Sequence, residues 1–413
     1  MAEDVAGAAG TRRFTGLGHE RITFWQGVAI IFGANIGAGI LSLPYGSRTG
    51  GFPALVIALL VAGFLTTASM LYVAEVALRT DTPLQLSGLA RKYLGEAGSW
   101  LIFAGIVING FGALIAYASG GGQVLGELLG IPELAGSLLF YVPGAVVVWL
   151  GLKATGRSEQ AITIGMVALI AILVGWSVLG PGIDAANLTY LRPYFIVPIM
   201  NLAVFAFIAQ YTVPELARGL AQHAPRVLPR AVVAGMVATG FVLALVPFAA
   251  LGMMGPDGIT PVVTIAWANE LGQAAYYCAN VFAVLAMLTS FWAIGLTLMT
   301  NIFDRFSWPA GGSPLHRAMA LALVVVPPFL IAALGLAGFV SALGYAGGFA
   351  GAIMSIIPVL MLRQARRRGD REPEWKAGWV AHPVVQVALV VVFGLAFLYS
   401  LLTIAGLVPQ GWA

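Results

Sequence analysis

Glycine spacing marks the segment of this chain best suited to bind a small polar solute. Residues 31–46 read Ile-Phe-Gly-Ala-Asn-Ile-Gly-Ala-Gly-Ile-Leu-Ser-Leu-Pro-Tyr-Gly, so an apolar segment of membrane-spanning length carries Gly33, Gly37 and Gly39 near its middle. Backbone polar groups in hydrocarbon must be paired, and an unwound stretch is tolerated there only where it is buried in protein or lines a cavity. The pattern therefore predicts a broken helix and a midplane site built partly from main-chain groups.

The chemistry of such a site suits an α-amino acid, which offers one carboxylate and one ammonium group. The start of a half-helix presents unpaired N–H groups and a positive dipole end to an anion. Gly37, Ala38 and Gly39 have side chains small enough for a carboxylate to reach that backbone. The ammonium group needs oxygen acceptors, which a second break in the chain would supply.

That second break is predicted within residues 205–216. Proline removes a backbone donor and clashes with the carbonyl four residues back, so Pro214 predicts a kink. Carbonyls freed around residues 206–210 would then accept hydrogen bonds from the ammonium group. Four polar residues beside the two breaks are expected to add side-chain contacts: Asn35, Gln210, Tyr211 and Thr212. Pairing with a neighbouring helix is the alternative role for each of the four.

A candidate cation site lies further along the chain, at Ala286, Thr289 and Ser290. Positions i, i+3 and i+4 share one face of a helix, so this face offers a carbonyl and two hydroxyls. Oxygen ligands of this kind suit a hard cation such as Na⁺. The alternative is that both hydroxyls bond back to carbonyls of their own helix.

Two carboxylates fall inside predicted spans, at Glu75 and Glu215. An ionisable residue within a membrane span is a functional candidate by default. Each is expected either to relay a proton or to pair with a loop arginine as a gate. For Glu215 we favour the gate or a structural pair.

Composition sets the class of protein to which these sites belong. Sixty per cent of the 413 residues are hydrophobic and only 9% are charged, which is typical of a polytopic helical membrane protein. The formal charge of +4 does not indicate a nucleic-acid partner, because the basic residues lie in short loops between apolar segments.

Neither an enzyme nor a channel fits the pattern of residues. The four histidines fall in predicted cytoplasmic segments, which excludes intramembrane haem ligation and a helical zinc site, and no nucleophile elbow is present. No metal site other than one for Na⁺ is expected. A channel needs a ring of filter groups, and no tandem pore loop appears.

Polar and Gly/Pro punctuation divides the chain into eleven spans, each near the roughly 20 residues needed to cross a bilayer. The predicted spans are 23–47, 52–78, 99–128, 134–152, 158–180, 195–218, 228–254, 274–303, 316–336, 339–363 and 383–407. With the N-terminus inside, all but Arg48 and Arg192 of the 21 lysines and arginines are cytoplasmic. An odd number of spans places the C-terminus outside.

The two predicted breaks fall in spans one and six, which suggests a duplicated architecture. An inverted repeat of five plus five helices with an eleventh appended would produce this spacing. We expect an all-α polytopic protein with four parts: a cytoplasmic tail (1–22), a first repeat (23–180), a second, inverted repeat (195–363), and an eleventh span with an extracytoplasmic C-terminus (383–413).

Three stretches, residues 33–46, 207–214 and 282–291, resemble the amino acid/auxin permeases, most closely their hydroxy and aromatic amino acid permease branch. The resemblance covers nearly the whole chain. It implies the leucine-transporter fold of the amino acid, polyamine and organocation superfamily, with alternating access around helices one and six. This chain has Gln210 where a histidine is common in that branch.

The resemblance also implies a fuller set of site residues. The carbonyls of Gly33 and Ile36 would complete a five-oxygen cation site with the face of residues 286–290. The residues themselves suggest two further expectations. Wall residues that would select the side chain are Asn109, Phe111, Tyr117, Phe205 and Tyr345. If residues 37–39 bind the carboxylate, a β-branched residue at Gly39 is expected to occupy its place in a protein that still folds.

The function expected from the sequence is secondary active transport of an amino acid, coupled to Na⁺ or H⁺, in the plasma membrane. An uncoupled or exchange-type carrier is the alternative. No cofactor is expected beyond the coupling ion. The expected partners are a free amino acid and the lipid bilayer, and the protein is expected to work as a monomer. The amino acid carried and the stoichiometry stay open.

Overall fold

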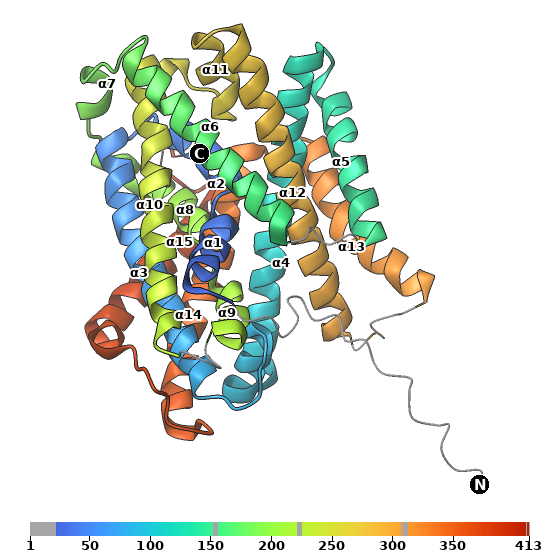
Figure 1. Cartoon of the computed structure of the whole chain (residues 1–413), viewed down its shortest axis with the longest axis vertical. Coiled ribbons are helices and arrows are strands. Elements are labelled where there is room, and N and C mark those ends of the chain that lie inside the picture. Colours follow the sequence, from blue (N-terminus) through green and yellow to red (C-terminus); the bar gives the residue numbers. More distant parts are fainter. Residues whose placement is uncertain are drawn as a thin grey trace.

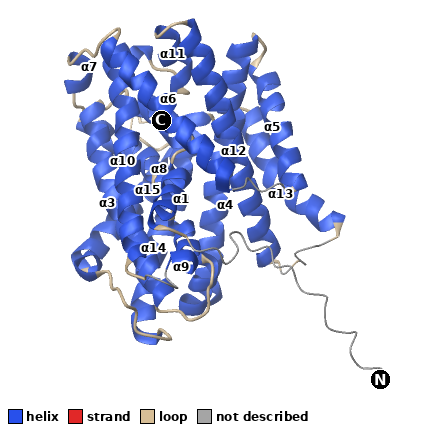
Figure 2. Cartoon of the chain, in the orientation of Figure 1, coloured by secondary structure: helices blue, strands red, loops and turns tan. Residues whose placement is uncertain are grey.

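The computed structural model describes residues 22–151, 156–220, 225–306, 308, 313–409 and 411–412, without the side chains of 156–163. In these ranges the chain is helical and has no strand (Figure 2). The expected cytoplasmic tail, apart from Ile22, lies outside the described residues. So do the predicted cytoplasmic residues Lys153, His19 and His223.

Nine segments in the described ranges are long and apolar enough to cross a membrane. They are α3 (Phe52–Leu78), α4 (Leu86–Leu129), α5 (Glu133–Leu150), the composite Pro193–Leu220, α10 (Val227–Met254), α12 (Gln273–Arg305), α13 (Pro314–Ala333), α14 (Phe339–Arg368) and α15 (Pro383–Ile404). The pair α1 (Phe24–Asn35) and α2 (Ala38–Ser47), bent by 51°, makes a tenth. The remaining predicted span is α6 (Gly156–Leu179), whose apolar part is Ile164–Leu179.

The order of these segments confirms the all-helical, multi-pass architecture predicted from the sequence. Short elements connect them: α7 (Ala186–Thr189), η3 (Pro256–Gly258), α11 (Val263–Glu270) and η4 (Gly378–Ala381). The division into repeats at 23–180 and 195–363 stays a prediction.

Span one is broken where the glycine pattern predicts. Thr23 caps α1, because its hydroxyl accepts from the Gln26 amide (3.3 Å) and the Gln26 side chain accepts from the Thr23 amide (2.8 Å). Ile36 then turns to an extended conformation and the chain re-enters a helix at Ala38. The last carbonyls of α1 and the first amides of α2 therefore lie on either side of the same break, where both lack intrahelical partners.

Span six is broken as well, but the break lies before Pro214, the residue from which it was predicted. The composite segment contains η1 (Pro193–Phe195), α8 (Ile196–Ala206), η2 (Gln210–Thr212) and α9 (Val213–Leu220). The chain leaves the helix at residues 207–209, and Pro214 lies in the first turn of α9. Proline is well tolerated there because its missing N–H would have no intrahelical partner. Pro214 thus begins the second half-helix and does not kink the first.

The third predicted span also begins earlier than expected. Helical structure starts at Leu86, and Gly95 interrupts it with φ 75° and ψ −165°, a backbone conformation that glycine adopts without steric cost. The membrane part of α4 follows this kink.

The two broken segments lie among the other spans. In Figure 1, α1, α2 and α8 lie toward the middle of the view, with α3 and α10 on one side and α4 and α12 on the other. Helix α1 packs on α10, while α2 packs on α8 and α10. Small residues allow such close packing. Gly347 of α14, for example, lies so close to the Asn201 carbonyl of α8 that no side chain fits between them.

Candidate functional site

The start of α2 forms the centre of the candidate site. The first amides of a helix have no intrahelical partner. Here the phenol of Tyr117 from α4 lies close to the Ala38 amide and to the Ser290 hydroxyl of α12. A methyl group placed on Gly37 would lie 3.4 Å from the Tyr117 hydroxyl oxygen and 3.7 Å from Ser290 Oγ. Gly37 therefore keeps open a small space bounded by amides and two hydroxyls.

Gly39 has a different environment from Gly37. A Cβ atom at Gly39 would lie 2.9 Å from the Ala206 Cβ and 3.1 Å from its Cα, so this glycine permits close approach of α2 and α8. The expectation that a side chain here would fill the carboxylate position in an otherwise intact fold is wrong, because it would first collide with α8.

The break in span six contributes Phe205 and Tyr211 to this region. Phe205 lies at the end of α8, with its ring 3.6 Å from the Cβ position of Gly39. Tyr211 lies close enough to Tyr117 for their hydroxyls to interact electrostatically. Helix α8 ends at Ala206 and η2 begins at Gln210, so the carbonyls of residues 206–208 are not followed by a continuing α-helix. These carbonyls are the acceptors that the sequence predicts for an ammonium group.

The other three polar candidates pair with protein groups. Asn35 Nδ2 donates to Met236 Sδ of α10 (3.4 Å), and Thr212 Oγ1 donates to the Ala209 carbonyl (2.8 Å). Gln210 is fully buried and its Nε2 donates to Ser355 Oγ of α14 (3.0 Å). These contacts match the alternative of interhelical or local pairing. The side-chain oxygens of Asn35 and Gln210 are buried without a partner among the described residues.

The candidate cation ligands divide into two groups. Thr289 Oγ1 donates to the carbonyl of Ala286 (2.9 Å), which is the local bond weighed against a cation site. Ser290 instead faces Gly37 and Tyr117. Gly33 and Ile36 lie at the C-terminal end of α1, where carbonyls lack helical partners and the dipole end is negative. Cation binding by these five residues stays a prediction.

Glu75 is the most strongly paired carboxylate in the described chain. It is fully buried and accepts from Arg79 Nε (3.0 Å), from Arg366 Nε and Nη2 (2.9 and 2.8 Å) and from the Ala377 amide (2.8 Å). These contacts join α3, α14 and the loop before α15. Two guanidinium groups favour the ionised carboxylate, so the geometry supports the paired gate over the proton relay.

Glu215 lies in the first turn of α9, where a negative charge is favoured by the helix dipole. Its Oε1 accepts from Gln85 Nε2 (3.2 Å), at the residue that precedes α4. The contact joins the second half of span six to α4, which fits the gate or structural role expected for Glu215.

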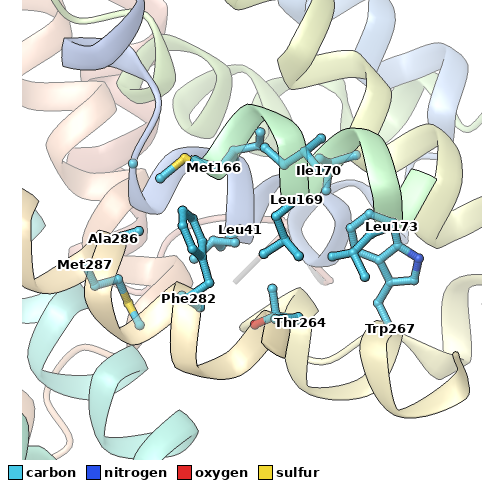
Figure 3. Close-up of a pocket in the computed structure, with 15 residues that line it drawn as sticks. Leu41, Met166, Leu169, Ile170, Leu173, Thr264, Trp267, Phe282, Ala286 and Met287 are labelled. Atoms are coloured by element: carbon cyan, nitrogen blue, oxygen red, sulfur yellow. The ribbon is translucent and has the colours of Figure 1, made fainter. Parts of the chain in front are cut away.

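A narrow apolar cleft opens beside Gly37, with a cavity volume of about 30 Å³. Figure 3 shows α6 side chains from Met166 to Leu173 along one wall and Phe282, Thr264 and Trp267 along the facing wall. Its other lining residues come from α2, α10 and α12. The hydroxyl oxygen of Thr264 is buried and has no partner among the described residues.

The sequence did not single out Thr264, because it lies between two predicted spans, on the short helix α11. No spacing or motif in that loop indicates contact with the membrane core. Tyr117 was expected only as a wall residue. Its contact with the Ala38 amide needs the three-dimensional packing of α4 on α2, which one sequence does not reveal.

The family model for the tryptophan/tyrosine permeases matches residues 20–400. Two similar proteins of Haemophilus influenzae are a tyrosine-specific transport system 1, 27% identical over 82% of this chain and 87% of its own length, and a tryptophan-specific transport protein, 28% identical over 83% and 87%. The chain thus spans most of each relative.

Among solved structures, MhsT in complex with L-phenylalanine has a similar fold, with a TM-score of 0.66 at 18% identity, over 92% of this chain and all of that one. The fold is therefore the leucine-transporter type expected from the sequence. The family match supports the aromatic-permease side of the expected resemblance and leaves its amino acid/auxin permease label a prediction. With residues 20–400 matched, this multi-pass membrane protein belongs to the tryptophan/tyrosine permease family.

Proposed function

We propose that this protein is a secondary active transporter of amino acids that works by alternating access around its two broken spans. One observation carries the proposal: the free amides at the start of α2, the Tyr117 phenol and the Ser290 hydroxyl converge around Gly37, which also borders an apolar cleft. Polar groups at one end of an apolar site suit a zwitterion with an apolar side chain.

The carboxylate would bind at the start of α2, where amides and the helix dipole favour an anion. The ammonium group would bind to carbonyls of residues 206–208, and the side chain would enter the cleft between α6 and α12. The names of the relatives, which refer to tyrosine and tryptophan, support an aromatic side chain as the one carried.

Uptake into proteoliposomes tests this function directly. Purified protein should take up radiolabelled L-tryptophan or L-tyrosine in a saturable and stereoselective manner. Tryptophanamide and tryptamine should compete poorly, because neither brings an anion to α2. Unsaturable, non-selective flux would instead support a channel, and uptake that needs amino acid on both sides would support an exchanger.

We propose Na⁺ as the coupling ion, with H⁺ as the alternative. The Ala286 carbonyl and the Thr289 and Ser290 hydroxyls lie one turn apart on α12, and the free carbonyl end of α1 would supply Gly33 and Ile36. Carbonyl and hydroxyl oxygens suit Na⁺. No group of three or more His, Cys, Asp or Glu side chains able to hold a metal ion occurs in the described part of the chain.

Removal of the Thr289 and Ser290 hydroxyls should show which ion drives transport. Thr289→Val with Ser290→Ala takes away two of five proposed oxygens, so the Na⁺ concentration for half-maximal uptake should rise by roughly tenfold or more. Because Ser290 also lies beside Tyr117 and Gly37, Thr289→Val alone is the more selective variant. Wild-type uptake that ignores an imposed Na⁺ gradient but follows an imposed pH gradient would assign the coupling to H⁺.

Tyr211 and Gln210 should behave differently although they are neighbours. Tyr211→Phe removes a hydroxyl near Tyr117 and should weaken substrate affinity by roughly 3- to 10-fold. Gln210→Ala breaks its bond to Ser355 and should lower the unfolding temperature while leaving the order of preferred substrates unchanged. Competition profiles across small, branched and aromatic amino acids check this. A changed order of preferred substrates in Gln210→Ala would indicate that Gln210 lines the substrate pocket.

The topology proposed from the sequence completes this picture. Lys and Arg placement puts the N-terminus in the cytoplasm and the C-terminus outside, in the plasma membrane. We propose that a monomer is sufficient for transport, since both broken spans come from one chain. Residue-specific labelling from each side of the membrane, at Arg48→Cys and Arg367→Cys in a Cys278→Ser background, would test the orientation.

A further inference from the structure

The hydroxyl of Thr264 is an unusual group in its surroundings. Its residue is 5% exposed and lines the apolar cleft, yet the oxygen has no hydrogen-bond partner among the described residues. Leaving a buried hydroxyl unpaired costs free energy, whereas a valine of similar shape would avoid that cost. A threonine at this position is therefore explained by a partner that arrives from outside the protein.

Trp267, a neighbour of Thr264 in the cleft, shows that an indole N–H paired with a hydroxyl fits this part of the protein. Trp267 lies three residues after Thr264, on the same face of α11, and both line the cleft. Its indole Nε1 donates to Ser177 Oγ of α6 at 2.8 Å. Ser177 in turn donates to the Leu173 carbonyl. The indole N–H of Trp267 is thus already paired with a hydroxyl, while the Thr264 hydroxyl has no partner among the described residues.

The other side chains that line the cleft are apolar and could contact an aromatic ring of the substrate. Phe282 and Leu169 lie near Thr264 in Figure 3, and the sulfur-containing Met166 and Met287 lie toward the end near Ala286. Thioether sulfur and aromatic side chains contact aromatic rings favourably. The cavity of about 30 Å³ is smaller than an aromatic ring, so these walls must move apart to admit one. The ring would then have one hydroxyl within its apolar surroundings, that of Thr264.

We infer that Thr264 determines specificity by accepting a hydrogen bond from the polar edge of the substrate's ring, the indole N–H of tryptophan or the phenol O–H of tyrosine. The inference rests on the proposed function and names the substrate class of that same site. Phenylalanine leaves the hydroxyl unpaired, so the protein favours the other two aromatic amino acids. A site that pairs with a substrate N–H or O–H discriminates strongly against an analogue lacking it.

The experiment compares Thr264→Val with the wild type in proteoliposomes, using L-tryptophan and β-(3-benzothienyl)alanine as competitors of tryptophan uptake. The second compound has sulfur in place of the indole N–H and nearly the same shape. The wild type should prefer tryptophan by about tenfold, and Thr264→Val should bring the ratio close to one. Thr264→Ser keeps a hydroxyl and should restore the preference.

Two controls separate specificity from folding. Thr239→Val removes another fully buried threonine hydroxyl, one that donates to the Gly235 carbonyl on α10, and should leave the ratio unchanged. Thr264→Val should unfold at a temperature no lower than the wild type without substrate, because it removes an unpaired polar group. Tryptophan should raise that temperature less in Thr264→Val than in the wild type.

The outcomes distinguish this inference from the proposed function. If the wild type takes up no aromatic amino acid, the proposed substrate class fails and the inference fails with it. If the wild type takes up tryptophan but Thr264→Val keeps the same ratio of tryptophan to its sulfur analogue, transport stands and the role of Thr264 is overturned. An equal loss of affinity for both compounds would also overturn it, because it would indicate a role in shaping the cleft only.

Discussion

Gly37→Ala should nearly abolish amino acid uptake in a protein that folds and inserts normally. The added methyl group would stand 3.4 Å from the Tyr117 hydroxyl and 3.7 Å from Ser290 Oγ, which are ordinary contacts. The methyl group therefore fits the fold, but it would block a substrate carboxylate from reaching the α2 amides. Losing one or two charge-assisted hydrogen bonds should weaken apparent affinity by roughly 10- to 100-fold.

Two other glycines make the comparison informative. Gly344→Ala on α14 places its methyl group 3.9 Å from Leu202 and should behave as the wild type. Gly39→Ala should also lose uptake, but with a lowered unfolding temperature, since its methyl group collides with Ala206. Uptake and thermal unfolding measured on all three variants separate the two causes. Normal uptake by Gly37→Ala would remove the main support for the proposed carboxylate site.

The contrast between Gly37 and Gly39 shows what the sequence predicts and where it stops. Glycine spacing correctly indicates that span one is interrupted, because an unwound stretch exposes polar N–H and C=O groups that lipid cannot pair and that protein must surround. It does not distinguish a glycine that leaves space for a ligand from one that leaves space for another helix. That distinction depends on how α2 packs against α8 and α4.

Span six gives a second example. The polar run before Pro214 correctly predicts a break, but the break lies at residues 207–209 and Pro214 begins the next half-helix. Proline marks both kinks and helix starts, and local sequence does not choose between them. Gln210 and Tyr211 illustrate the same limit, because a difference of one residue turns one side chain to Ser355 and the other toward Tyr117.

The buried cluster at the C-terminal end of α3 is a different kind of feature, since the sequence marks only its carboxylate. Arg79 is four residues after Glu75 and within reach on a helix, but Arg366 and Ala377 are 291 and 302 residues away in the chain. Packing of α14 on α3 brings them together. The cluster thereby ties α3, α14 and the loop before α15 into one unit.

Glu75→Ala should destabilise the protein by about 3–5 kcal/mol, because it leaves the Nε of the buried Arg79 and the Ala377 amide without their acceptor. Glu372→Gln is the control: its carboxylate is exposed and pairs with Lys376 and, at 3.5 Å, with Arg79 Nη1, so its loss should change the stability little. Glu75→Leu with Arg79→Leu should regain much of the lost stability, since it removes the stranded charge along with its partner. Thermal unfolding of the four proteins in detergent measures these differences.

Transport by Glu75→Gln distinguishes the paired gate from the proton relay. Glutamine keeps the shape of the side chain but loses the charge that holds Arg79 and Arg366. In a paired gate, the variant should lose stability, and uptake driven by an imposed Na⁺ gradient or by an imposed pH gradient should fall to the same extent. In a relay, the variant should be stable and should lose pH-driven uptake alone. The four hydrogen bonds to Glu75 lead us to expect the first result, because a carboxylate held between two guanidinium groups has little tendency to take up a proton.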